Sequence, residues 1–272
     1  MTAAALALTL AAAVLHAGWN VLLAGARDVR AATTGALGVS VLLFAPLAAA
    51  TWRLEAEAVP WLLASSALEL AYFGLLTAAY RGSDVSLVYP IARGAAPVLV
   101  LAGASAAGQG VGGWQAAGVL LVGAGVALVP GARRGVDLRG ILLGLAIAAT
   151  IAGYTLVDKQ GIEHASPLAY LELVLLPVAA LALLVGGRPG LARVRAELGL
   201  RVAGAAVASF SAYALVLGAL SLTAAPAVAA VRETSVLCAV ALGALVLGER
   251  VGRLRTAGAA LVAAGAVLVA AG

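Results

Sequence analysis

The sequence predicts an all-α integral membrane protein whose ten transmembrane helices form two inverted five-helix repeats. Its 272 residues are 64% hydrophobic and 11% charged, with a mean hydropathy of +1.09. A soluble domain is about 45–50% apolar and about 25% charged. This composition therefore indicates a chain that lies in a lipid bilayer. An internal duplication and the number of apolar segments lead to the same fold class.

The duplication joins two stretches about 140 positions apart, LAGASAAGQGVGGWQAAGVLLVGAGVALV from Leu101 and VALGALVLGERVGRLRTAGAALVAAGAVLV from Val240. At that offset five glycines coincide: Gly103 with Gly243, Gly108 with Gly248, Gly112 with Gly252, Gly118 with Gly258 and Gly125 with Gly265. Duplicated membrane units are typical of transporters, which bind substrate between the repeats near the bilayer midplane. The predicted repeats are residues 1–132 and 133–272.

The individual helices follow from length, because about 20 apolar residues cross the hydrocarbon. Ten stretches qualify: 2–24, 31–50, 59–80, 84–107, 113–130, 138–158, 166–186, 201–222, 225–248 and 255–271. Five segments per half is an odd number, so two copies read in the same order cross the membrane in opposite senses. Pro90 and Pro97 share one segment and free backbone carbonyls, so we expect the fourth segment to be the irregular one.

The charges lie mainly between these segments. Thirteen of the 17 Lys and Arg residues fall in odd-numbered loops, and the positive-inside rule then places those loops in the cytoplasm and both termini outside. The net charge of +5 forms no stripe on a soluble domain, so no nucleic-acid partner is expected. We expect a multi-pass protein of the plasma membrane, of the bacterial inner-membrane type.

Several ionisable residues lie inside the apolar segments. A charge at the helix centre costs about 2.5–3.5 kcal/mol on insertion scales and usually faces a cavity or another charge. At the repeat offset Arg93 falls on Glu233 and Ala92 on Arg232. We expect Arg93 and Glu233 to face each other across a central cavity, with Arg93 or Arg232 holding an acidic substrate group and Glu69 or Glu233 carrying a proton. The alternative is a structural ion pair that joins the halves without contacting substrate.

Aromatic and amide side chains extend this predicted site. His16, Trp19 and Asn20 stand on one face of the first segment. HAGWNVL aligns with IAGYTLV, so Trp19 falls on Tyr154. Tyr89 lies one turn before the arginine of the fourth segment. We expect all five side chains to shape a substrate site, although helix-to-helix hydrogen bonding and packing would also explain them.

The motifs of other functions are missing from the sequence. It contains no G-x-x-x-x-G-K-[ST], H-E-x-x-H, C-x-x-C or G-x-S-x-G, so neither a primary pump nor an enzyme is expected. The single cysteine, Cys238, permits no disulfide within one chain. No cofactor and no metal site are predicted.

The two repeats resemble the EamA-type branch of the drug/metabolite transporter superfamily. The resemblance is carried by LGERVGRLRTAGAALVAAGAVLV, with its Gly248–Glu249 step, and by AYRGSDVSLVYPIARGAAPVLV from Ala79. It implies a ten-helix secondary carrier of small metabolites such as amino acids or related amines and acids, often moved outward, with both termini in the cytoplasm. The chain departs from the family pattern at Gln109, where the family has a glutamate, and its charge bias gives the opposite orientation.

The predicted function is secondary transport of a small polar metabolite, an amino acid or a related amine or organic acid, across the plasma membrane, with proton-coupled efflux as its expected form. One alternative is a multidrug or quaternary-ammonium exporter, which would need an acidic cavity without fixed cations. Another is a non-transporting membrane scaffold. The expected partners are a small-molecule substrate and the lipid bilayer, while the substrate, direction, coupling ion and oligomeric state stay open.

Overall fold

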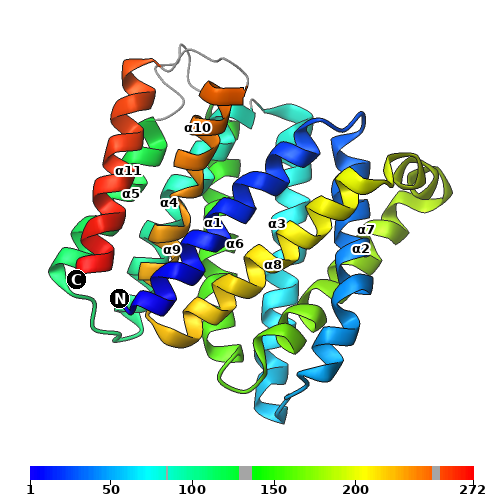
Figure 1. The fold of residues 1–272 in the computed structure, drawn as a ribbon, viewed down its shortest axis with the longest axis horizontal. Coiled ribbons are helices and arrows are strands. Elements are labelled where there is room, and N and C mark those ends of the chain that lie inside the picture. Colours follow the sequence, from blue (N-terminus) through cyan, green and yellow to red (C-terminus); the bar gives the residue numbers. More distant parts are fainter. Residues whose placement is uncertain (84, 129–136, 247–251) are drawn as a thin grey trace.

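The protein is described by a computed structural model covering residues 1–83, 85–128, 137–246 and 252–272, and the regular elements of these residues are helices (Figure 1). Their bounds are α1 Ala3–Ala24, α2 Val29–Ala50, the 3-10 helix η1 Ala56–Ala58, α3 Val59–Gly82, α4 Val85–Ala106, α5 Gly113–Leu128, α6 Leu138–Gly161, α7 Pro167–Glu197, α8 Leu200–Leu222, α9 Ala225–Arg232, α10 Ser235–Val246 and α11 Arg253–Ala271. Within this part of the chain, eight helices are long and apolar enough to cross a membrane. The predicted all-α membrane class is confirmed.

The two halves of the chain make equivalent helix contacts with each other. α1 of the first half packs against α8 of the second, and α6, the counterpart of α1, packs against α3, the counterpart of α8. α2 lies beside α7, and α5 lies beside α11 at the opposite end of the molecule (Figure 1). The N-terminal ammonium lies 3.5 Å from the carbonyl oxygen of Ala270, so the two termini meet on one side.

Glycines bring α5 and α11 into backbone contact. A Cβ on Gly118 would lie 2.7 Å from the Gly265 carbonyl oxygen, and a Cβ on Gly125 would lie 2.7 Å from that of Gly258. Residue numbers increase along α5 in the direction in which they decrease along α11. The two helices therefore run antiparallel, as inverted repeats predict. The two contacts are also interchanged by the repeat offset, which places Gly118 on Gly258 and Gly125 on Gly265.

Three predicted segments differ from the structure. The fourth segment, expected to be irregular, is the single helix α4 with both prolines inside it. The break lies instead in the ninth segment, between α9 and α10. α7 also continues past its predicted end at residue 186, with a kink at Gly187, where a φ of 55° favours glycine. The predicted boundary between the repeats, 132/133, lies outside the described residues.

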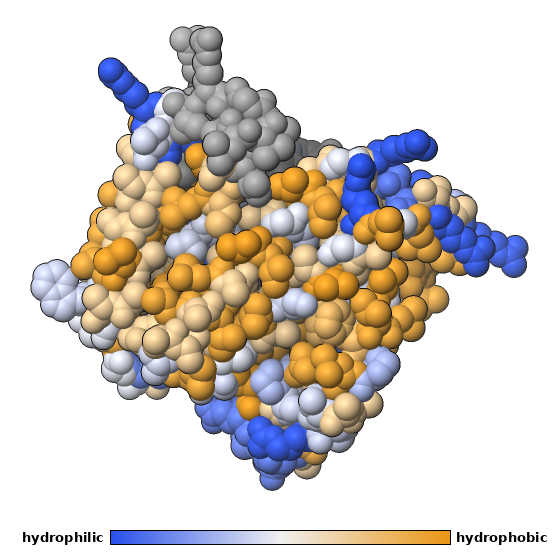
Figure 2. Space-filling model, in the orientation of Figure 1, coloured by the Kyte–Doolittle hydropathy of each residue, from blue (hydrophilic) through white to orange (hydrophobic). Residues whose placement is uncertain are grey.

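The surface separates into an apolar middle and polar ends. Figure 2 shows apolar side chains over the middle of the visible face, with strongly hydrophilic side chains toward its upper and lower edges. Leu42 of α2 and Leu184 of α7 are among the large apolar side chains that remain exposed. Lipid tails, and not water, are the solvent that such a belt requires.

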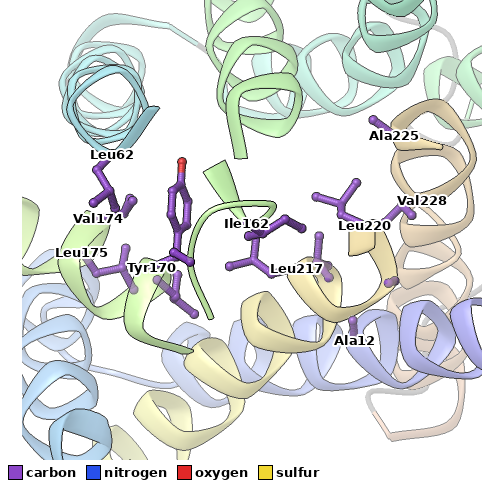
Figure 3. Packing of buried hydrophobic residues seen from close by; sticks show 14 of the residues in the cluster. Ala12, Leu62, Ile162, Tyr170, Val174, Leu175, Leu217, Leu220, Ala225 and Val228 are labelled. Atoms are coloured by element: carbon purple, nitrogen blue, oxygen red, sulfur yellow. The ribbon is translucent and has the colours of Figure 1, made fainter. Parts of the chain in front are cut away.

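The main apolar core lies where α7 and α8 meet the ends of α3, α6 and α9. Figure 3 shows Tyr170, Val174 and Leu175 of α7 in this cluster, together with Leu217 and Leu220 of α8. The Tyr170 ring lies so close to the α6 backbone that a Cβ on Gly161 would overlap it. This glycine therefore allows the Tyr170 hydroxyl to reach the end of α6.

Replacing Gly118 by alanine should lower the stability of the detergent-solubilised protein. The new methyl group meets the backbone of α11, which cannot rotate away, and overpacking of this kind costs about 1–3 kcal/mol. Gly18→Ala is the matched control, because a Cβ on Gly18 of α1 meets no atom within 4 Å. Thermal unfolding should separate the two variants, and equal melting temperatures would contradict the α5–α11 contact.

Candidate functional site

The break between α9 and α10 lies within a buried polar run, Arg232–Glu233–Thr234–Ser235. Hydroxyl side chains compete with the helical backbone for its hydrogen bonds, and Thr234 Oγ1 donates to the Val231 carbonyl oxygen at 2.7 Å. The amides of Val236 and Leu237 bond three residues back, so the turn satisfies its own backbone. Interrupted helices inside membrane carriers mark binding sites, and this break brings Glu233 into the protein interior.

Arg93 of α4 meets Glu233 across the two halves. Its Nε lies 3.0 Å from Glu233 Oε2, and its Nη2 donates to Ser235 Oγ at 3.3 Å. The Glu233 side chain is fully buried, and the Arg93 side chain is only 8% exposed. The structure thus brings together the two residues that the repeat offset relates. The expectation that they face each other across a central cavity is wrong, because a contact of 3.0 Å leaves no space between them.

Arg232 approaches the same carboxylate from the other side. Its Nε lies 3.9 Å from Glu233 Oε1, and its side chain is 9% exposed. Among the described residues, Arg232 Nε, Arg93 Nε and both Glu233 carboxylate oxygens are buried without a hydrogen-bond partner. Two guanidinium groups therefore share one carboxylate, and the shared centre holds more positive than negative charge.

A second polar centre joins α3, α6, α7 and α8. Asp158 Oδ1 lies 2.5 Å from Ser65 Oγ and 3.2 Å from the Tyr170 hydroxyl, while its Oδ2 lies 2.6 Å from the Tyr213 hydroxyl. The same Tyr213 hydroxyl lies 3.1 Å from Glu69 Oε1. We call Glu69, Asp158 and Tyr213 the acid pair and its bridging tyrosine. Glu69 and Asp158 are both almost fully buried.

Tyr154 links the two polar centres. Its ring centroid lies 6.4 Å from that of Tyr72, edge to face, and 5.9 Å from that of Tyr213. The charges of Arg93, Arg232, Glu69 and Asp158 all act on its hydroxyl. The predicted residue Tyr154 is therefore placed where the cationic and acidic centres meet.

The α1 residues make mostly local contacts. Trp19 Nε1 donates to His16 Nδ1 at 3.3 Å, with the two rings edge to face, and the Asn20 amide donates to the His16 carbonyl oxygen at 2.7 Å. His16 lies within electrostatic reach of Arg93 and Arg232. His16 therefore lies near the charged centre.

Tyr89 lies on α4 beside a small pocket between α3, α4 and α6. It is 41% exposed and lines the pocket together with Tyr72 and Arg93. Apolar side chains, including Ile147 and Ile151 of α6, form the rest of the wall. Arg93 and two phenol groups therefore line the same small pocket.

A cluster of two glutamates and one histidine lies beside η1. Glu55, Glu57 and His164 place their ligand atoms within 4.8 Å of one another. However, the Glu55 carboxylate already contacts Arg53 and His164, each at 3.2 Å, and the groups are largely exposed. These contacts explain the cluster as a link between the η1 loop and the loop after α6.

Sequence reasoning did not find Tyr213, Tyr170 or Ser65, and it left Asp158 outside the site. The repeat offset of 140 gave no signal for this contact, because it places Glu69 on Ser209 and Phe73 on Tyr213. The Glu69–Tyr213 contact therefore joins positions that the repeat does not relate, unlike the contact between Arg93 and Glu233.

The fold and the buried charged residues define a multi-pass helical membrane protein with a polar interior. Residues 138–271, which lie within the second predicted repeat (133–272), match the EamA-like transporter family, which belongs to the drug/metabolite transporter superfamily. The chain is therefore an EamA-type member of that superfamily, which confirms the resemblance seen in the sequence.

Comparisons with solved structures and with curated proteins add one similar fold and no further relative. A solved structure described as "Crystal structure of protein" is similar with a TM-score of 0.74 and 16% identity, over 99% of this chain and 98% of that one. At that identity the likeness shows the fold alone. A comparison with curated proteins found no match.

Removing the charge of Glu233 should destabilise the protein strongly. Glu233→Gln leaves two buried guanidinium groups without a counter-charge, and breaking a buried pair costs about 3–5 kcal/mol. The double variant Arg93→Gln/Glu233→Gln removes one charge of each sign and should recover part of the loss in thermal unfolding. A double variant less stable than Glu233→Gln would show that Arg93 is not held by this carboxylate.

Proposed function

We propose that this chain is a secondary transporter of a small polar metabolite that carries an acidic group, an amino acid or a related organic acid, across the plasma membrane. The observation that supports this most directly is the arrangement around Glu233, where one carboxylate faces two guanidinium groups at 3.0 and 3.9 Å. Arg232 makes the longer contact, and its Nε is buried without a hydrogen-bond partner among the described residues. It is the group that would receive the substrate's carboxylate or phosphonate.

The chemistry of the centre supports an anionic group over a cationic drug. Arginine presents a planar fork of donors that matches carboxylate and phosphate geometry, whereas two nearby fixed cations would repel a quaternary ammonium ion. Tyr154 and His16 lie within electrostatic reach of Arg232 and would complete the contacts to the substrate. Tyr89 and Tyr72 would line the approach to Arg93.

Coupling to protons is the second part of the proposal. The sequence offers Glu69 and Glu233 as proton carriers. Glu233 already lies beside two arginines, whereas Glu69 forms a hydrogen bond with the neutral Tyr213 hydroxyl. Glu69 is therefore the preferred carrier.

Arg232→Gln should weaken solute binding by about tenfold or more, because a hydrogen bond to a charged group contributes about 1.5–3 kcal/mol. The measurement is a thermal-shift screen of the purified protein against amino acids, amines, organic acids and phosphonates, followed by uptake of the stabilising solute into reconstituted vesicles. Arg193→Gln is the control, since the Arg193 side chain is 64% exposed and its Nε lies 3.8 Å from Asp28 Oδ2, outside both polar centres.

Three outcomes would contradict the proposal. Normal transport by correctly folded Arg93→Ala and Glu233→Gln would remove both residues from the site. Stabilisation by quaternary amines alone would favour the exporter. No movement of any solute in the panel, by folded protein in sealed vesicles, would favour the scaffold.

A further inference from the structure

The polar centre around the acid pair has fewer hydroxyl hydrogens than close oxygen–oxygen contacts. Three hydroxyls, those of Ser65, Tyr170 and Tyr213, each carry one hydrogen. They make five close oxygen–oxygen contacts: Ser65 with Asp158, Tyr170 with Asp158 and with the Trp61 carbonyl oxygen, and Tyr213 with Asp158 and with Glu69. An ionised carboxylate only accepts, so two of the five contacts lack a hydrogen when both acids are ionised.

The Tyr213 contacts show where a hydrogen is missing. The Tyr213 hydroxyl lies 2.6 Å from Asp158, which is the shorter contact and takes the phenol hydrogen. The remaining 3.1 Å contact to Glu69 Oε1 then has a lone pair on each side. A proton on Glu69 turns this contact into a hydrogen bond donated by the carboxyl group to the tyrosine oxygen.

The surroundings do not supply enough positive charge to replace that proton. The titratable and charged groups facing the acid pair are Tyr72 on α3, Tyr154 on α6, Tyr170 on α7, Tyr213 on α8 and Arg232 on α9. Arg232 is the only cation of this set, and it also approaches Glu233. Lys159, next to Asp158 in the chain, directs its ammonium group to the Leu220 carbonyl oxygen at 2.6 Å.

We propose that Glu69 and Asp158 form a proton-binding site that holds one proton between them through the Tyr213 hydroxyl. Two carboxylates close together in a medium of low dielectric constant repel each other unless one of them is protonated. With the proton on Glu69, the carboxyl group donates to the Tyr213 oxygen and the phenol hydrogen is donated to Asp158. The proton reaches Asp158 when the phenol hydrogen passes to Asp158 and the Tyr213 oxygen takes the proton of Glu69, so that the new phenol hydrogen is donated to the ionised Glu69. The inference deepens the proposed transport function, because it assigns the coupled proton to this pair and not to Glu233.

The test is infrared difference spectroscopy of the purified protein between acidic and alkaline buffer, which detects the carbonyl stretch of a protonated carboxyl group. The wild type should show such a band from the acid pair, and the band should titrate with pH. Its band should disappear in Glu69→Gln and shift in Asp158→Asn. Tyr213→Phe should move the pH at which the band is lost, because the bridging hydroxyl is gone.

Glu172→Gln is the matched control, since Glu172 is a buried acid on α7 that belongs to neither polar centre. It should leave the titrating band in place. A band that survives unchanged in both Glu69→Gln and Asp158→Asn, or one that disappears only in Glu233→Gln, would overturn the proposal. If one acid variant fails to fold, the other acid variant and Tyr213→Phe still decide the result.

This experiment needs no substrate, so it separates the two proposals. Loss of the band in Glu69→Gln together with absent solute transport would refute the transporter while leaving the proton site established. Transport that depends on Arg232, together with a band that the acid-pair variants leave unchanged, would support the transporter and refute the proton site.

Discussion

The structure depends on keeping ionised side chains inside hydrocarbon, where each needs a partner or a polar cavity. The chain meets this requirement with two polar centres, one around Glu233 and one around Asp158. Each centre is built from helices of both halves, because Arg93 reaches Glu233 and Glu69 reaches Tyr213. The charges therefore determine how the halves are joined, and the apolar belt around them only has to match the lipid.

Close packing at the periphery allows those contacts in the middle. No hydrophobic force acts between helices in lipid, so small residues that let backbones touch supply the packing. The glycines of α5 and α11 do this at one end of the molecule, and Gly161 does it for Tyr170 at the end of α6. A larger residue at Gly161 would displace the Tyr170 ring and remove one of the hydroxyls that holds Asp158.

Composition and segment length predicted the helices well, because insertion in lipid depends on about 20 apolar residues and little else. The repeat offset predicted which charges meet, since equivalent positions in inverted repeats face each other; Arg93 and Glu233 follow that rule. The break after Glu233 could not be predicted from glycine or proline, because polar side chains that bond the backbone cause it. Tyr213 was missed for a related reason: a phenol in an apolar segment looks like packing until its partner is known.

The two centres are linked by electrostatics as well as by Tyr154. Arg93 and Arg232 carry two positive charges, and Glu233 with a singly protonated acid pair carries two negative ones, so these five groups are neutral together. In the proposed proton site, loss of the shared proton would leave one net negative charge, which would act on Arg232 and oppose an incoming acidic group. The proposed proton and the proposed acidic solute would therefore favour each other's binding, and by linkage each would raise the affinity of the other by the same factor. Such coupling would need no contact between the solute and the proton site, because Arg232 would respond to both.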